Sequence, residues 1–256
     1  MTRVIAVANQ KGGVGKTTLA LGLASAAWNR HWRTLVVDLD PQANASMGVG
    51  LMDPALTVGD ALADGRPGVA AEAIVPSTWG RGTDVLPSEP AVEHRVAEAA
   101  PGSEQRLRTV LAGIGHRYEI VVIDCPPSLG ALTREALAAS DLALVVTTPS
   151  YFGAQGVERA MAEIDEVRKN HNRDLQLAGI VVNRVRSVAE EHQYREHELV
   201  EIYGRSAVMK PLMPERIAVQ QAEGYGQPVQ LVKTAGGREV ADIYGTYLTK
   251  LLKAAR

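Results

Sequence analysis

The chain has 256 residues, a formal net charge of −2 at pH 7 and one cysteine. This length suits one large domain with a substantial core, and the near-neutral charge excludes a global basic field that would draw the protein onto nucleic acid or a membrane surface. One cysteine excludes a disulfide or a four-cysteine cluster within the chain. Aromatic residues, at 4%, argue against a surface that stacks single-stranded nucleic acid. Because there is no signal peptide and no apolar run of the roughly 18–20 residues that span a bilayer, we expect a cytoplasmic protein without membrane contact.

Strand-like and helix-like segments alternate along the chain. The expected strands are nearly continuous apolar runs, as in strands buried on both faces of a parallel sheet: Val4–Ala8, Thr34–Val37, Asp84–Leu86, Ile120–Ile123, Leu142–Thr147 and Leu177–Val182. The expected helices have apolar residues three and four apart: Leu19–Asn29, Ser103–Leu111, Leu132–Ala138, Val157–Lys169, Gln193–Tyr203 and Val240–Ala254. The alternation predicts an α/β fold with a doubly wound, mainly parallel sheet flanked by helices. The stretch from Met52 to Pro90 contains loop signals but no clear domain break, so residues 1–256 are expected to form a single domain.

The segment NQKGGVGKTT, residues 9–18, follows the first expected strand and precedes the first expected helix. A strand, a glycine-rich loop, Lys-Thr and a helix, in this order, are typical of a phosphate-binding P-loop. Its glycines let backbone N–H groups turn toward phosphate oxygens, and the helix N-terminus adds partial positive charge. Lys16 is expected to reach the β- and γ-phosphates, and Thr17 to offer its hydroxyl to Mg²⁺. Gln10 stands where the usual motif has its first glycine. The expected nucleotide-binding residues of the loop are Lys11, Gly12, Gly13, Val14, Gly15, Lys16, Thr17 and Thr18.

Two other expected strands end in acids, which should lie at the same edge of the sheet as the P-loop. Asp38 and Asp40 end one of them, and alternation along a strand would point both side chains to the same side. They indicate either a site for Mg²⁺ and water or a pair of exposed carboxylates. Asp124 ends the other strand in a Walker B arrangement, in which the acid holds Mg²⁺ through water. Cys125 follows it and, with no second cysteine in the chain, is expected to be a plain buried thiol.

The segment KGGVGKT resembles the deviant Walker A motif of the ParA/MinD group of P-loop ATPases. In that group the early lysine, here Lys11, crosses a dimer interface and contacts the nucleotide of the other subunit. The resemblance therefore implies an ATP-dependent nucleotide-sandwich homodimer in which Lys11 and Lys16 neutralise phosphate charge during catalysis. VDLDPQANAS resembles the ParA switch I region, which implies that Asp40 positions the attacking water and lies in the magnesium shell. DCPPS, which starts at Asp124, is close to switch II of the same family.

Two later segments extend the resemblance. Asn183 ends a strand where the family has an asparagine that contacts adenine, and MPERIAVQQAEGYGQPV, from Met213 to Val229, resembles the ParA stretch IPRNVRLSEAPSHGKPI. The backbone near Pro214 would complete the base pocket. The chain departs from the family at Ala43 and near His31, where relatives have glycine. A left-handed residue would end the first helix at His31, with Asn29 as the alternative cap.

The resemblance runs from Val4 to about Leu252 and, with no N-terminal helix-turn-helix extension, fits the short Soj-like type of ParA partitioning ATPase. It implies ATP and Mg²⁺ as cofactors, hydrolysis stimulated by a ParB-like partner, non-specific binding to double-stranded DNA and association with the nucleoid. MinD relatives end in a basic amphipathic membrane helix, whereas the stripe containing Tyr247 and Leu251 looks core-facing. The nitrogenase iron-protein group requires cysteines that this chain lacks.

The DNA-binding pattern of the family is incomplete here. Its arginines in IPRNVR fall at Glu215 and Ala218, and the expected helix from Glu190 to Tyr203 carries five glutamates. The remaining candidates for phosphate contacts are Lys210, Arg216, Lys233 and Arg238.

Two other functions fit the same motifs. One is an ATPase that positions another cargo, such as a protein compartment. The other is a metabolic P-loop synthetase that phosphorylates a small acid, although Lys11 argues against it. The histidines at 171, 192 and 197 match no common zinc spacing.

Overall fold

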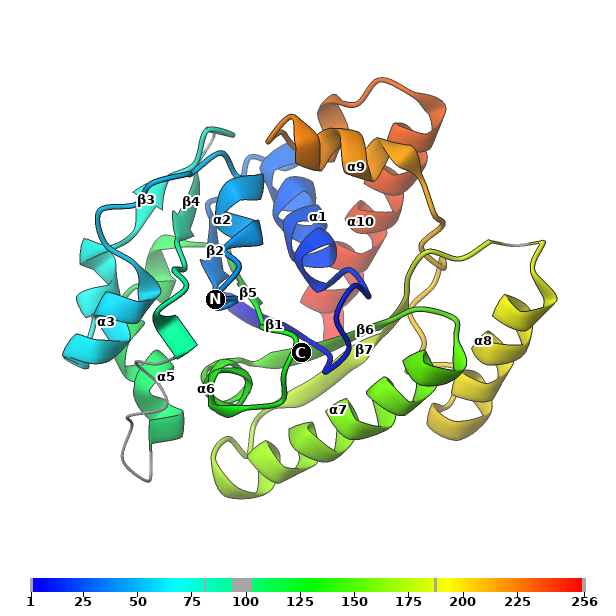
Figure 1. The fold of residues 1–256 in the computed structure, drawn as a ribbon, viewed down its shortest axis with the longest axis horizontal. Helices are drawn as coiled ribbons and strands as arrows, with labels where there is room; N and C mark the ends of the chain where they lie inside the picture. The colour runs from blue at the N-terminus through cyan, green and yellow to red at the C-terminus, as the bar shows by residue number, and fades with distance from the viewer. Residues whose placement is uncertain (1, 81, 94–102, 187, 255–256) are drawn as a thin grey trace.

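The computed structural model describes residues 2–80, 82–93, 103–186 and 188–254, and Figure 1 shows a sheet with helices on both faces. The sheet has seven strands in the order β3-β4-β2-β5-β1-β6-β7. The strands are β1 (Arg3–Ala8), β2 (Thr34–Asp38), β3 (Val75–Pro76), β4 (Thr83–Leu86), β5 (Ile120–Asp124), β6 (Leu142–Thr147) and β7 (Gln176–Val182). All pairings are parallel except that of β3 with β4. The predicted doubly wound α/β fold is confirmed.

Described α-helices follow β1, β2, β4, β5, β6 and β7, with more than one after β2 and after β7. The α-helices are α1 (Lys16–Asn29), α2 (Asn44–Gly48), α3 (Val58–Asp64), α5 (Arg106–Val110), α6 (Ala131–Ala139), α7 (Tyr151–Asn170), α8 (Glu190–Tyr203), α9 (Ile217–Gly224) and α10 (Ala235–Ala254). Short 3-10 turns are η1 (Val69–Glu72), η2 (Ser103–Gln105), η3 (Gly115–Arg117) and η4 (Val229–Leu231). Among these helices none is long and apolar enough to cross a bilayer.

Side-chain alternation along the strands builds two cores. Ile5 and Val7 of β1 face α1, α9 and α10, whereas Ala6 and Ala8 face α5, α6 and α7 on the opposite side of the sheet. Because both faces are covered, the central strands are apolar at nearly every position, which is why they are recognisable in the sequence. A smaller cluster around Trp28 and Trp79 joins α1 to α2.

All six strands and six helical segments expected from the sequence are present, with longer ends. The segment Ser103–Leu111 divides into η2 and α5, and α7 begins at Tyr151, earlier than expected, because Ser150 caps it by accepting from Gly153 N at 3.2 Å. Among the described residues, the α-helices and strands that were not predicted are α2, α3, α9 and the two-residue strand β3. They are short, and the first two lack a long apolar period.

His31 follows the end of α1 in the left-handed conformation that was expected from the glycine of relatives at this place. It is in the left-handed region with φ 58°, and Trp32 N donates to Ala27 O at 3.1 Å across it. Asn29, the alternative cap, is the last helical residue.

Candidate functional site

The P-loop joins β1 to α1 at the carboxyl edge of the sheet. Gly13 and Gly15 have φ 74° and 96°, and a Cβ on Gly15 would lie 2.2 Å from Asn183 Nδ2, so only glycine fits there. The loop borders a cavity of about 510 Å³. The P-loop residues that line this cavity are Gly12, Gly13, Gly15, Lys16, Thr17 and Thr18. Val14 is buried behind the loop, and its carbonyl accepts from Asn183 Nδ2 at 2.8 Å.

Lys16 begins α1 and is 6% exposed. Its Nζ donates to the carbonyl of Lys11 at 3.4 Å, so the loop curls around the ammonium. Burial lowers the pKa of Lys16, while Asp124 and Asp40 act in the opposite direction and favour the charged form. The arrangement keeps a cation at the cavity wall where phosphate oxygens would lie.

Asp124 carries the signature of a metal-binding carboxylate. It is fully buried, and neither of its oxygens forms a hydrogen bond of normal geometry within the described residues, although the Thr17 hydroxyl is close enough to act on the pKa of Asp124. Burial, and then the neighbouring Asp38, raise the pKa of Asp124 well above its usual value. A buried carboxylate without partners is costly unless a cation compensates it. Thr17 and Asp40 both line the adjacent cavity, and hydroxyl and carboxylate oxygens are the donors that Mg²⁺ prefers. Thr17, Asp40 and Asp124 therefore fit the ion.

Asp38 and Asp40 have different surroundings in the structure, although the sequence pattern suggested one paired site. Asp38 lies beside Asp124 in the β2–β5 register and is fully buried. Its carboxylate accepts from Ser46 N and Ser46 Oγ, both at 2.8 Å, and therefore holds the start of α2. Asp40 lines the cavity and accepts from Gln42 N at 2.9 Å. The reading of both acids as exposed strand-end carboxylates is wrong, because Asp38 is 0% and Asp40 6% exposed.

Ala43 lies between Asp40 and α2 in the left-handed region, with φ 52°. Ala43 N donates to Asp40 O at 2.8 Å, so this turn directly follows the cavity acid. The conformation explains why glycine is common in the family at this position, since a Cβ there is strained.

Lys11 lies at the open side of the loop. Its Nζ is 3.4 Å from Ser150 Oγ and 6.0 Å from the ring centre of Phe152, and no described carboxylate forms an ion pair with it. Asn9 supports the turn before it, because its Oδ1 accepts from Lys11 N at 2.9 Å and its Nδ2 donates to Val146 O at 2.7 Å. Asn9 was not singled out from the sequence, where its contact with β6 leaves no local signal.

The two residues expected near adenine do not line this cavity. Asn183 is 6% exposed and bonds to the P-loop backbone, and Pro214 borders a different cavity of about 520 Å³. Arg184 and Glu223 line the P-loop cavity instead, and the sequence reasoning missed both. Arg184 is in the left-handed region with φ 56°, where Asn183 Oδ1 accepts from its N–H at 2.9 Å.

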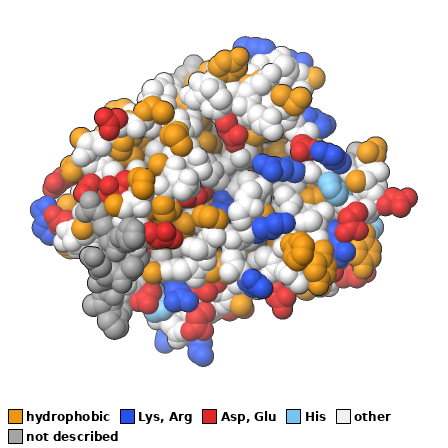
Figure 2. Space-filling view, in the orientation of Figure 1, with side chains coloured by type: hydrophobic (Ala, Val, Ile, Leu, Met, Phe, Trp, Pro, Cys, Tyr) orange, Lys and Arg blue, Asp and Glu red, His pale blue; other side chains and the backbone are white. Residues whose placement is uncertain are grey.

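The four candidate DNA contacts are dispersed and partly neutralised. Arg216 pairs with Glu239 at 2.7 Å, and Lys210 pairs with Glu196. Arg238 donates to the backbone carbonyl of Lys233 at 2.9 Å. Figure 2 shows charges of both signs interspersed over the visible face.

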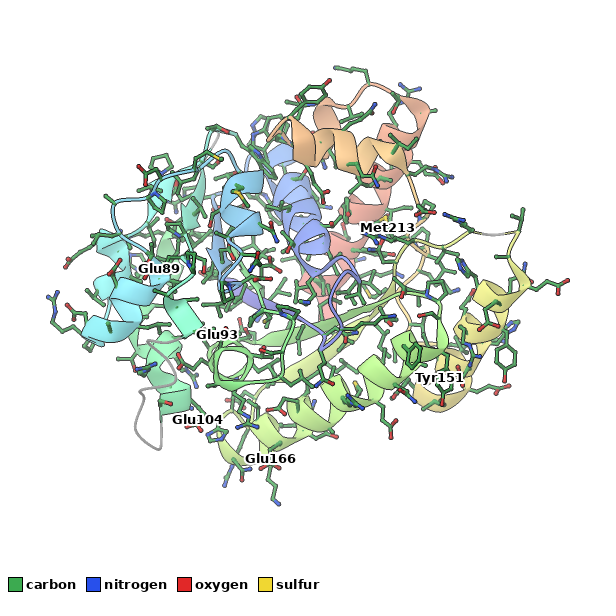
Figure 3. All side chains as sticks on the ribbon, viewed as in Figure 1. Glu89, Glu93, Glu104, Tyr151, Glu166 and Met213 are labelled. Atoms are coloured by element: carbon green, nitrogen blue, oxygen red, sulfur yellow. The ribbon has the colours of Figure 1, made fainter. Side chains whose placement is uncertain are left out.

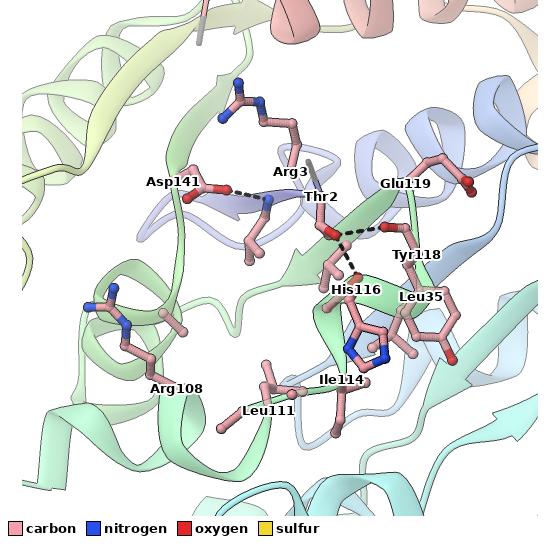
Figure 4. A pocket seen from close by; sticks show the side chains of 16 residues that line it. Thr2, Arg3, Leu35, Arg108, Leu111, Ile114, His116, Tyr118, Glu119 and Asp141 are labelled. Atoms are coloured by element: carbon pink, nitrogen blue, oxygen red, sulfur yellow. Dashed lines mark hydrogen bonds between the residues drawn. The ribbon is translucent and has the colours of Figure 1, made fainter. Parts of the chain in front are cut away.

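A second cavity, of about 840 Å³, lies at the other edge of the sheet, next to the start of β1 (Figure 4). Arg3, Arg108, His116 and Asp141 are among its lining residues, and Asp141 accepts from Val4 N at 2.9 Å. Ligands of open parallel sheets bind beyond the carboxyl ends of the strands. The smaller cavity, at the P-loop, is therefore the candidate active site.

Comparison with known proteins agrees with this geometry. The sequence family described as an AAA domain matches residues 2–177. The chain is 35% identical to the chromosome partitioning protein ParA of Myxococcus xanthus, over 91% of this chain and 83% of that protein. It is 32% identical to the sporulation initiation inhibitor protein Soj of Bacillus subtilis, over 90% of this chain and 91% of that protein.

Solved structures show the same fold with nucleotides. Cobyrinic acid a,c-diamide synthase from Mycobacterium smegmatis, with a bound ATP analogue and magnesium, superposes with a TM-score of 0.78 and 29% identity, over 88% of this chain and 93% of that one. The cell division ATPase MinD of Pyrococcus furiosus superposes with a TM-score of 0.78 and 25% identity over 100% of both chains. The phosphate-binding loop, the buried acids and these relatives together place the chain in the ParA family of P-loop ATPases, as an enzyme that uses ATP and Mg²⁺.

Proposed function

We propose that this chain is a partitioning ATPase that forms a nucleotide-sandwich dimer, binds double-stranded DNA without sequence preference and hydrolyses ATP under the control of a ParB-like partner, to segregate a chromosome or plasmid. In this proposal it works in the cytoplasm, associated with the nucleoid. The observation that carries it is Lys11, a cation directly before the cavity-lining glycines, whose described contacts are a hydroxyl and an aromatic ring rather than a carboxylate.

The geometry favours a partner at this place. Lys16 would supply positive charge to the phosphates of its own loop, so a second lysine, whose Nζ instead lies toward Ser150, is best placed for a nucleotide held by another copy. Phe152, whose ring faces Lys11 Nζ, and Tyr151, which packs edge-on against Phe152 at 5.5 Å, are 66% and 55% exposed. Figure 3 shows Tyr151 where α7 begins, near α8. Arg195 of α8 stacks on Tyr151 at 5.5 Å, and exposed aromatic and arginine side chains are enriched at protein interfaces.

The chemistry is in-line attack of water on the γ-phosphate, which depends on positioning and charge stabilisation. Backbone N–H groups from Gly12 to Thr17 would hold the phosphates, and Lys16 and Lys11 would neutralise them. Asp40 would orient the attacking water. Thr17, Asp40 and, through water, Asp124 would hold Mg²⁺, which would supply charge neutralisation for the phosphates. Asn183 and Pro214 would contact the base through a shift that releases Asn183 from the carbonyl of Val14.

DNA binding in the proposal uses phosphate contacts from Lys210, Arg216, Lys233 and Arg238, added over two subunits. Since the monomer has a net charge of −2, the attraction to DNA must come from local groups of cations, and a dimer would present two such groups.

A metabolic synthetase remains the second candidate, because the similarity to cobyrinic acid a,c-diamide synthase covers 88% of the chain. An ATPase that positions another cargo is the third. One experiment separates them: ATP turnover measured with and without duplex DNA and a candidate ParB-like protein. We expect slow turnover that rises several-fold only when both are present. Turnover that ignores both but requires a small carboxylic acid would overturn the proposal in favour of a synthetase.

A further inference from the structure

Glu223 occupies an unusual position for an acid. It belongs to α9, lines the P-loop cavity, and its Oε1 accepts a hydrogen bond from Thr18 Oγ1 at 2.6 Å. Thr18 directly follows the residues that are expected to bind phosphate and Mg²⁺. A carboxylate beside a triphosphate site would repel the phosphates unless it faces another part of the nucleotide.

The position of Glu223 is held by the fold. Ala218 and Ala222 anchor α9 in the core against α1 and α10. Thr18, the partner of Glu223, is held in turn by α10, because Tyr244 Oη donates to Thr18 O at 3.3 Å. On the C-terminal side of the helix, Trp79 Nε1 donates to Gly226 O at 2.9 Å. The carboxylate is therefore presented at the cavity wall by a fixed helix rather than by a loose loop.

The hydrogen-bond acceptors of Glu223 and the hydrogen-bond donors of ATP together decide which part of ATP Glu223 can bind. An ionised carboxylate only accepts hydrogen bonds, and Thr18 uses one of its acceptor sites. ATP offers few donors: the two ribose hydroxyls and the amine of adenine. Thr18 and Glu223 line the same cavity as the P-loop residues that would hold the phosphates, and the ribose is the group that follows the phosphates along the nucleotide.

We propose that Glu223 accepts hydrogen bonds from the ribose hydroxyls of ATP and makes the site selective for ribonucleotides over deoxyribonucleotides. The inference rests on the use of ATP by this chain and not on the dimer, DNA or ParB-like partner. The alternative is that Glu223 serves only α9, as a surface acid tied to Thr18.

The test is the ratio of affinities for ATP and its deoxy analogues. Dissociation constants for ATP, 2′-deoxy-ATP and 3′-deoxy-ATP are measured by calorimetry with Mg²⁺ for the full chain and for Glu223→Ala, Glu223→Gln and Gln221→Ala. Since a hydrogen bond to a charged group is worth about tenfold or more in affinity, we expect the wild type to bind at least one deoxy analogue roughly tenfold more weakly than ATP. Glu223→Ala should bind ATP about tenfold more weakly and lose the discrimination.

The other variants separate the proposal from a structural role. Glu223→Gln keeps an acceptor without the charge and should retain part of the discrimination, whereas Gln221→Ala, an exposed position on the same helix, should behave as wild type. Equal affinity of the wild type for ATP and both analogues would overturn the proposal, as would undiminished discrimination in Glu223→Ala. Failure of the wild type to bind ATP would instead contradict the P-loop assignment, and is recognised because no nucleotide would then bind.

Discussion

In the proposed mechanism Asp40 orients the attacking water, so its replacement should separate ATP binding from ATP hydrolysis. Asp40 lines the P-loop cavity, whereas the phosphates would be held by backbone N–H groups of the loop. Asp40→Ala should therefore keep ATP binding and reduce turnover by at least about a hundredfold, in the range attributed to a lost positioning or general-base group.

Sizing chromatography and turnover check the role of Asp40 together. With ATP, Asp40→Ala should remain a dimer, whereas the control Lys16→Ala should not bind ATP by calorimetry and should stay monomeric. Wild-type turnover in Asp40→Ala would show that this carboxylate does not orient the water.

Replacing Ala43 by glycine tests whether the backbone is strained at the turn after Asp40. A non-glycine residue in the left-handed region is disfavoured by about 1–2 kcal/mol, partly offset by the greater freedom of glycine in the unfolded chain. Ala43→Gly should raise the free energy of unfolding by about 0.5–1 kcal/mol in urea titrations. The matched control Ala45→Gly, at a buried helical position in α2, should lower it by about 1 kcal/mol or more. A destabilised Ala43→Gly variant would contradict the strain.

At the scale of single elements, the start of α7 is where the dimer proposal is tested most directly. Lys11→Ala should leave nucleotide binding to the monomer largely intact, because Lys16 serves the same loop, but should prevent ATP-dependent dimers. Phe152→Ala should weaken the dimer about tenfold or more in analytical ultracentrifugation, as loss of an exposed aromatic anchor does. Ile202→Ala, an equally exposed apolar position on α8, is the control. Normal dimers from Lys11→Ala would refute the sandwich.

Helix α6 contains a buried acid that makes stability depend on pH. Glu135 is fully buried between α6 and α5, where its Oε1 lies 3.4 Å from Arg106 Nη2. Burial raises the pKa of Glu135 to about 7, against the opposing effect of Arg106. The native state therefore binds a proton that the unfolded state releases, so this residue's contribution to the free energy of unfolding falls as pH rises from about 4.5 to 7.

Glu135→Gln removes this dependence. The variant should match wild type in urea titrations at pH 5 and be more stable by on the order of 2 kcal/mol at pH 8, since one pKa unit corresponds to about 1.4 kcal/mol. Glu201→Gln, an exposed position, should show no such change with pH. A difference between Glu135→Gln and wild type that is the same at both pH values would rule out the buried charge as the cause.

At the scale of the whole molecule, DNA binding depends on how cations add up over a dimer. Binding should require ATP and should fall steeply with salt, with a log–log slope of about −0.9 for each phosphate contact. Changing Lys210, Arg216 and Lys233 to Glu together should abolish retention of duplex DNA at low salt. Unchanged retention in this triple variant would place the DNA surface elsewhere, and no retention by the wild type with ATP would favour a role that does not use the nucleoid.

The helices show which features of the fold are predictable from local sequence. The helices from α5 to α8 and α10 were found because their apolar residues repeat over several turns. The helix α3 was missed although Thr57 and Asp60 form a capping box, a signal that a search for S/T-x-x-D/E would have found. The helix α9 was read only as a stretch similar to ParA, so the contact of Glu223 with Thr18 could not be anticipated.

The sequence by itself determined which functional groups follow which strand: a glycine-rich loop follows β1, and acids follow the apolar strands β2 and β5. These features are local, because a P-loop needs its glycines and Lys-Thr at fixed spacing, and a doubly covered sheet needs continuous apolar strands. Only the tertiary structure decided that Asp38 holds Ser46 while Asp40 faces the cavity, and that Glu223, far along the chain, meets Thr18. The physical reason is that a side chain's role depends on which distant groups desolvate it or donate to it, and those groups come together only when the sheet and its two helical layers are packed.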